Sequence, residues 1–183
     1  IQSELVRITP GPVVTMYEVR PAPGIRVNRI ANLSDDLALA LKAIAVRIQA
    51  PIPGSDTVGI EIPNDDREIV NFRELASSED FRKGCGPLTM ILGKDIAGRP
   101  FMADLTRMPH LLVAGATGAG KSVCLNGILL SLLYRTQPEE MRLLLVDPKR
   151  IEMAMYADEP HLIHPVVTEM SEAKNALDWA VHV

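Results

Sequence analysis

The segment HLLVAGATGAGKSV, residues 110–123, contains the pattern G-x-x-x-x-G-K-[ST]. Four residues carry this pattern: Gly115, Gly120, Lys121 and Ser122. The pattern is typical of a loop that holds the phosphates of a nucleotide between a buried strand and a helix. An apolar run precedes the loop and a run with helical periodicity follows it, as that arrangement requires. The alternative is a glycine-rich turn without a ligand, but such a turn gives no reason for Lys and Ser in succession.

Each position of this loop has a physical role. Gly115 lets the chain leave the strand sharply, and Gly118 and Gly120 allow backbone angles that turn successive N–H groups toward an anion. Lys121 is expected to reach the β- and γ-phosphates as the catalytic residue, and the Ser122 hydroxyl is expected to ligate Mg²⁺. The predicted cofactors are therefore ATP and Mg²⁺. The predicted nucleotide-binding residues are Gly115, Ala116, Thr117, Gly118, Ala119, Gly120, Lys121, Ser122 and Val123.

A second chemical feature is Asp147, which ends the apolar run MRLLLVD (141–147). The carboxyl end of a parallel strand would lie near the phosphate loop. Pro148 and Lys149 follow, so no adjacent glutamate can serve as the base for an attacking water. Three interpretations remain open. Asp147 binds Mg²⁺ directly, or it acts indirectly with Lys149 near the phosphates or a neighbouring subunit, or it accepts local backbone hydrogen bonds at a strand exit.

The composition excludes several classes of protein. Hydrophobic residues make up 47% and charged residues 23% of the 183 residues, as in globular proteins with a real core. No apolar run approaches the roughly 18 residues that span a bilayer, and we recognise no signal peptide. The two cysteines have no metal or redox spacing and are expected to be free thiols. The net charge of −4 gives no sign of a nucleic-acid partner.

The polar stretch ASSEDFRKGCGP (76–87) divides the chain into two parts. Before it, the pattern predicts strands at 12–20, 57–63 and 67–72 and one helix over 32–48. That helix is predicted to bury one stripe, made of Leu33, Leu37, Leu41 and Ile44. Together these elements make a small α/β module.

After the division, the pattern predicts a hairpin of two strands (87–93 and 99–105) and a helix over 122–136. Buried strands are predicted at 110–115 and 141–147. Continuous apolar strands separated by a helix favour a parallel sheet covered on both faces. A last helix, SEAKNALDWAVHV (171–183), has no cap at its end, so we expect the chain to stop inside a helix. The predicted fold class is therefore α/β.

Several segments together resemble one family. MPHLLVAGATGAGKSVCLN, LLLVDPKRIEM, PHLIHPVVT and EAKNALDWAV closely resemble the FtsK/SpoIIIE family of bacterial DNA translocases. The upstream segments NLSDDLALAL, AVRIQAPIPG, VGIEIPN and PLTMILGKDIAG resemble it as well. The resemblance covers nearly the whole chain, and the order and spacing of these segments are more specific than the phosphate loop alone.

This resemblance implies a larger machine. Family members are hexameric rings that hydrolyse ATP to pump double-stranded DNA during chromosome segregation at cell division or sporulation. The cytoplasmic motor has a small α domain and a RecA-like β domain, and a separate N-terminal region anchors it in the bacterial inner membrane. Residues 1–86 correspond to the α domain and 87–183 to the first, incomplete part of the RecA-like P-loop ATPase domain. The residues that match the family's ATP loop are Gly115, Thr117, Gly118, Gly120, Lys121 and Ser122.

Several features of the family pattern are not found in this sequence. The Walker B pair of Asp and Glu after an apolar strand is missing, and so are the pore loops, the winged helix, the arginine that reaches a neighbour's nucleotide and the membrane anchor. We interpret the chain as a fragment of the motor and expect it not to hydrolyse ATP alone. Double-stranded DNA and a homo-hexamer are expected from the resemblance, not from the charge.

Two other functions remain open. One is a nucleotide-gated assembly module that binds ATP to set a ring interface without pumping DNA. The other is a small-molecule kinase, but we see neither the lid nor the acceptor site that a kinase needs after its loop. Stimulation of hydrolysis by DNA would separate a DNA motor from both, and a phosphorylated small molecule would select the kinase.

Overall fold

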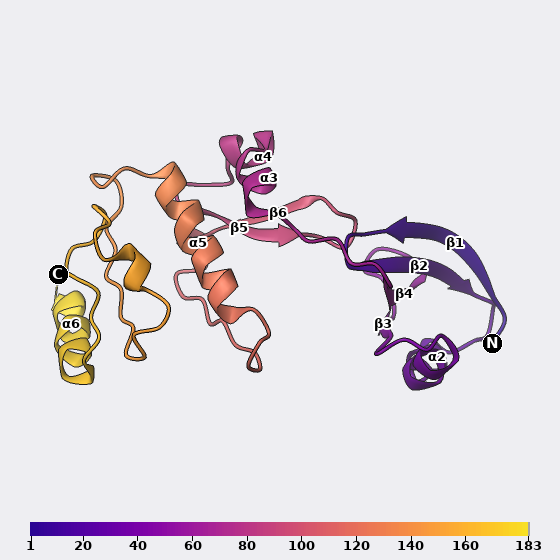
Figure 1. Cartoon of the computed structure of the whole chain (residues 1–183). Helices are drawn as coiled ribbons and strands as arrows, with labels where there is room; N and C mark the ends of the chain where they lie inside the picture. The colour runs from indigo at the N-terminus through magenta and orange to yellow at the C-terminus, as the bar shows by residue number, and fades with distance from the viewer. Residues whose placement is uncertain (183) are drawn as a thin grey trace. The chain divides into compact units, whose positions relative to one another are not determined.

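A computed structural model describes residues 1–182 of the chain (Figure 1). The chain forms two compact units, and each is described by itself. The first unit contains Ile1–Ser78 and Gly93–Phe101. The second contains Glu79–Leu92 and the residues from Met102 onward. Helices and strands both occur along the chain, which confirms the predicted α/β class.

A four-stranded antiparallel sheet forms the centre of the first unit (Figure 1). Its order is β1-β2-β4-β3, and the strands are β1 (Ser3–Pro10), β2 (Val14–Pro21), β3 (Arg47–Gln49) and β4 (Val58–Pro63). The strands predicted at 12–20 and 57–63 are confirmed as β2 and β4. The sequence pattern does not predict β1, because this edge strand is exposed on both faces and so carries no clear alternation.

The prediction of a single helix over 32–48 is wrong. Two short helices, α1 (Val27–Ala31) and α2 (Ser34–Ala40), occupy residues 27–40. None of the residues of α2 is buried. The end of the predicted helix is instead the strand β3.

Pairing with β4 explains why this helix does not form. The three residues of β3 lie opposite Gly59–Glu61 of β4, so the backbone there is extended. Lys42 has a positive φ of 52°, which takes the chain out of the helical path. The predicted buried stripe fails for the same reason, since Leu41 is 49% and Ile44 is 89% exposed. Tertiary pairing has overridden the helical periodicity.

The strand predicted at 67–72 is also wrong. This segment is a loop that leads into α3 (Phe72–Ala76), and Ile69 in it is 89% exposed. The Asn71 side chain accepts a hydrogen bond from the Arg73 N–H at 2.9 Å and so caps α3. A helix start therefore replaces the end of the predicted strand.

The second unit is built around the long helix α5 (Lys121–Arg135), which confirms the helix predicted over 122–136. The predicted hairpin is confirmed as β5 (Thr89–Lys94) and β6 (Pro100–Asp104). Two short helices, α4 (Glu79–Lys83) and the 3-10 helix η1 (Leu105–Arg107), flank the hairpin in sequence.

Two apolar clusters hold α5 on different sides. The first cluster contains Met90, Ile128, Leu132 and Met141. The second contains Leu129, Leu145 and Tyr156. The buried α5 residues of these clusters lie in the second half of the helix, away from the first turn next to the phosphate loop.

Ser131 fixes α5 against β5. The residue is completely buried. Its hydroxyl donates to the Gly127 carbonyl at 2.6 Å and accepts from the Ile91 N–H at 3.0 Å. The helix thus supplies an acceptor to a buried N–H of the hairpin.

Replacing Ser131 with alanine is expected to lower the free energy of unfolding by about 1–3 kcal/mol, because the Ile91 N–H loses its acceptor inside the core. Urea unfolding followed by circular dichroism measures the change. Ser171→Ala, at an exposed serine of the same unit, is the control and should change the free energy by less than about 0.5 kcal/mol. Equal losses in the two variants would contradict the assigned role of Ser131.

The buried strands predicted at 110–115 and 141–147 are not strands in the structure. Among residues 1–182, the first segment has no ladder partner, and Leu112 is 90% exposed. A strand depends on hydrogen bonds to a neighbour, so an apolar run without one stays irregular. The second segment forms isolated parallel bridges between Leu143 and Leu162 and between Val146 and Val167. These bridges run in the predicted parallel direction, but they do not form a parallel sheet within the described residues.

The last described element is α6 (Met170–His182), which confirms the helix predicted near the end of the chain. Val183, the final residue of that prediction, lies outside the described residues. Ala173 is the residue of α6 that is buried. Between residues 1 and 182, no helix combines the length and the apolar character needed to cross a bilayer.

Candidate nucleotide-binding site

The phosphate loop is exposed and leads directly into α5. Gly118 and Gly120 have φ angles of 80° and 92°, in the left-handed region that favours glycine. The Ala119 N–H donates to the Ala116 carbonyl at 3.1 Å and closes a turn. Gly120 is the N-cap of α5, so the free N–H groups of the first helical turn lie beside the loop. The structure therefore brings the predicted loop residues together at one helix N-terminus.

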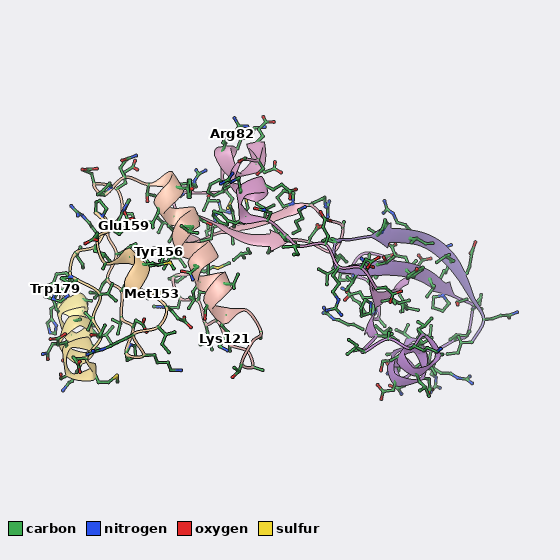
Figure 2. The ribbon with its side chains drawn as sticks, in the orientation of Figure 1. Arg82, Lys121, Met153, Tyr156, Glu159 and Trp179 are labelled. Carbon is green, nitrogen blue, oxygen red and sulfur yellow. The ribbon has the colours of Figure 1, made fainter. Side chains whose placement is uncertain are left out.

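Lys121 folds back over this loop from the first position of α5 (Figure 2). Its ammonium group donates to the Gly115 carbonyl at 2.8 Å and to the Ala116 carbonyl at 2.9 Å. Both acceptors are neutral, and hydrogen bonds to a charged phosphate oxygen are stronger. A phosphate in the loop can therefore compete for the ammonium group without any change in the helix.

Ser122 has a partner that the sequence pattern does not predict. Its hydroxyl donates to the carboxylate of Glu152, 30 residues further along the chain. Glu152 lies in the segment after Asp147, so this segment reaches the first turn of α5. A carboxylate therefore lies next to the hydroxyl that was predicted to ligate Mg²⁺.

Asp147 holds this segment in place. Its carboxylate accepts backbone hydrogen bonds from Glu152 at 2.9 Å, from Met153 at 3.1 Å and from Lys149 at 3.2 Å. The bonds from Glu152 and Met153 contribute most to lowering the pKa of Asp147 below its usual value. Asp147 is buried and its own N–H donates to the Val167 carbonyl at 2.8 Å. These contacts are those of a local backbone acceptor, and they also link Asp147 indirectly to Ser122.

Lys149 does not reach the phosphate loop through any contact in the described structure. Its backbone N–H belongs to the turn around Asp147, and the residue is exposed. The next residue, Arg150, has a positive φ of 54° and an ion pair with Glu169. The basic pair after Asp147 is thus part of a turn whose side chains face solvent.

A second contact joins the same segment to α5. The Tyr156 hydroxyl, in the 3-10 helix η2 (Ala154–Tyr156), donates to the Asn126 side chain at 2.8 Å. Asn126 lies four residues, about one helical turn, after Ser122, and Tyr156 lies four residues after Glu152. Burial raises the pKa of Tyr156, and the charge of Glu159 adds to this effect. The segment is therefore attached to α5 at two successive turns.

Sequence reasoning missed three residues of this arrangement: Asn126, Glu152 and Tyr156. A weak signal exists, because Ser122 and Asn126 are polar residues on one face of a mostly apolar helix. Nothing in the sequence pairs that face with the segment after Asp147. Contacts between residues so far apart depend on the folded chain.

The lowered pKa of Asp147 predicts a pH-dependent contribution to stability. A carboxylate whose folded pKa is depressed stabilises the protein above its unfolded pKa, near 3.8, and loses this contribution as the pH falls through the folded value. Asp147→Asn should therefore lower the melting temperature at pH 7, and the gap to the wild type should narrow below about pH 4.

Thermal unfolding followed by circular dichroism at neutral and acidic pH measures this gap. Asp158→Asn, at an exposed aspartate of the same unit, is the matched control and should unfold like the wild type at neutral pH. A gap for Asp147→Asn that is constant from neutral to acidic pH would contradict the prediction.

The residues of the site fit a nucleotide with Mg²⁺. Two left-handed glycines, the start of a 15-residue helix and the ammonium group of Lys121 provide donors for phosphate oxygens. The Ser122 hydroxyl provides an oxygen ligand of the kind that Mg²⁺ prefers, and the Glu152 carboxylate beside it adds negative charge.

A separate hollow of the second unit, with a volume of about 400 Å³, is lined by residues between Leu144 and Trp179. Its lining includes Val167 and residues of α6 but no residue of the phosphate loop. We therefore place the candidate site at the exposed loop and not in this hollow.

Comparison with known proteins identifies the family. The model of the FtsK/SpoIIIE family matches residues 71–183, and the model of the FtsK alpha domain matches residues 1–64. The chain belongs to the FtsK/SpoIIIE family. The resemblance noted in the sequence is thereby confirmed. Residues 65–70 lie between the two matched ranges.

Relatives in this family are called DNA translocases. The chain is 52% identical over 177 residues to "DNA translocase FtsK" of Helicobacter pylori, which covers 97% of this chain and 21% of the relative. It is 51% identical over 181 residues to "DNA translocase SftA" of Bacillus subtilis, covering 99% of this chain and 19% of the relative. The chain thus spans about a fifth of the length of the curated relatives it matches.

One solved structure is similar over the whole chain. It is described as the "Structure of pCW3 conjugation coupling protein TcpA monomer form with ATPgS". The sequence identity is 21%, the TM-score is 0.46, and the match covers 100% of this chain and 48% of that one.

Proposed function

We propose that the phosphate loop of this FtsK/SpoIIIE chain binds ATP together with Mg²⁺. The observation that supports this most strongly is the geometry of the loop, in which two left-handed glycines precede Lys121 and Ser122 in the first turn of α5. Lys121 holds the β- and γ-phosphates, and Ser122 ligates the cation. When bound, Mg²⁺ neutralises charge on the phosphates. The other proposed contacts are through Gly115, Ala116, Thr117, Gly118, Ala119, Gly120 and Val123.

We further propose that the full-length protein is an ATPase that moves double-stranded DNA, in chromosome segregation at cell division. The support is membership of the family and about 52% identity to relatives that are called DNA translocases. A homo-hexameric ring and anchoring in the inner membrane by another region belong to the same proposal. The net charge of −4 adds no support for DNA as a partner, so the proposal of DNA binding rests on the family alone.

Within this proposal, residues 1–86 form the small α domain and residues 87–183 the first part of a RecA-like domain. The isolated chain does not hydrolyse ATP, because its two candidate carboxylates are already engaged. Glu152 accepts from the Ser122 hydroxyl and Asp147 accepts from backbone N–H groups, so neither is free to act as a base. Turnover by residues 1–183 alone that disappears in Lys121→Ala would contradict this inactivity.

The two alternative functions predict different observations. A nucleotide-gated assembly module binds ATP at the same loop but is indifferent to DNA. A small-molecule kinase transfers the phosphoryl group to an acceptor instead of water. Analysis of the reaction products, inorganic phosphate or a phosphorylated small molecule, separates the kinase from the ATPase.

Equilibrium binding of a non-hydrolysable ATP analogue with Mg²⁺ to the full-length protein tests the nucleotide site. Lys121→Ala should weaken binding by about 10- to 100-fold, because a hydrogen bond between charged groups is lost. Lys174→Ala, at an exposed lysine of α6, should bind like the wild type. Failure of the wild type to bind the analogue would overturn the proposed site.

A further inference from the structure

The contact between Ser122 and Glu152 determines how the Ser122 hydroxyl is oriented. A serine hydroxyl has one proton to donate and two lone pairs to offer. Here the proton is directed to the Glu152 carboxylate. Both lone pairs are therefore left for other partners, which is the orientation that a metal ligand needs. Without this acceptor, the hydroxyl could donate to a phosphate oxygen or to the backbone of its own helix.

Glu152 is itself held from both sides along the chain. Before it, the Asp147 carboxylate accepts the N–H groups of Glu152 and Met153. After it, Tyr156 bonds to Asn126 on the same face of α5 as Ser122. Tyr156 is also buried in the cluster with Leu129. The position of Glu152 is thus set by contacts that do not involve the phosphate loop, as expected of a group that supports a metal ligand.

We propose that Glu152 is the positioning residue for the Ser122 hydroxyl, and that it couples nucleotide binding to Mg²⁺. The inference rests on the proposed binding of Mg²⁺ and nucleotide at this loop. The carboxylate orients the hydroxyl and adds negative charge beside a bound cation. The same charge gives no benefit to a nucleotide without a cation, since it repels the phosphates.

The proposal predicts a specific change in Glu152→Gln. The affinity for ADP in the presence of Mg²⁺ should fall about 10- to 100-fold, which is the usual effect of losing a group that supports a metal ligand. The affinity for ADP with EDTA should not fall. Glu139→Gln, at an exposed glutamate of the same unit, should match the wild type under both conditions.

Isothermal titration calorimetry on the full-length protein measures these affinities, so the result does not depend on catalytic turnover. Glu152→Asp provides a second variant that keeps the charge but is one methylene shorter, and it should show the same selective loss. In a Ser122→Ala background, Glu152→Gln should cause no further loss, because Glu152 acts through that hydroxyl.

Three results would overturn the proposal: equal losses with Mg²⁺ and with EDTA, no loss with Mg²⁺, or losses from Ser122→Ala and Glu152→Gln that simply add. If the wild type bound ADP under neither condition, the proposed nucleotide site would fail, and this inference would fail with it. That outcome is distinguishable because it appears in the wild type and not only in the variants.

Discussion

Lys121→Ala is expected to lower the kcat of ATP hydrolysis by the full-length protein about 10²- to 10³-fold or more. Lys121 is the first residue of α5, and its ammonium group already lies over the loop on the carbonyl oxygens of Gly115 and Ala116. In phosphoryl transfer, catalysis comes mainly from positioning and from stabilising charge on the phosphoryl oxygens. The loop pattern, residues 115–122, contains no second Lys or Arg that could replace this charge.

The release of inorganic phosphate measures this effect, with Lys174→Ala as the matched control. Thermal unfolding should be nearly unchanged in both variants, because the Lys121 side chain bonds only to exposed loop carbonyls. Hydrolysis by Lys121→Ala at the wild-type rate would mean that the loop does not hold the reacting phosphates.

Leu132→Ala is expected to cost about 2–5 kcal/mol in the free energy of unfolding. Leu132 is 3% exposed and belongs to the cluster with Met90, Ile128 and Met141. Its removal leaves a cavity between α5, β5 and the segment that begins at Met141. The change weakens the support of the helix that carries the phosphate loop.

Urea unfolding followed by circular dichroism tests this cost. Leu177→Ala, at a leucine of α6 that is 59% exposed, should change the free energy by less than about 0.5 kcal/mol. A loss at Leu132 no larger than that at Leu177 would show that the cluster does not stabilise the second unit.

The phosphate loop and α5 could be predicted from the sequence because their signals are local. Glycines at positions with positive φ, followed at once by Lys121 and Ser122, specify a turn and a helix start without reference to the rest of the chain. The hairpin of β5 and β6 is local in the same sense, since the Asp95 side chain and its neighbours close the turn between the two strands.

The failures arise where distant pairing decides the structure. Residues 47 and 48, the end of the predicted helix, pair with β4 as part of the strand β3. Residues 110–115 look like a buried strand, yet no strand pairs with them among residues 1–182. The sequence does not predict the role of Glu152, because its contact with Ser122 joins residues 30 positions apart. For Asp147 the sequence leaves three roles open, one of them a local backbone acceptor, and the folded turn supplies the three N–H donors that its carboxylate accepts.

ATP hydrolysis by the full-length protein, measured with and without long duplex DNA, tests the proposed DNA motor most directly. We expect strong stimulation by DNA that disappears in Lys121→Ala. Hydrolysis that depends on Lys121 but is indifferent to DNA, in a protein that is otherwise folded, would contradict DNA translocation. The nucleotide site would then stand, and the assembly module that binds ATP without pumping DNA would become the better description.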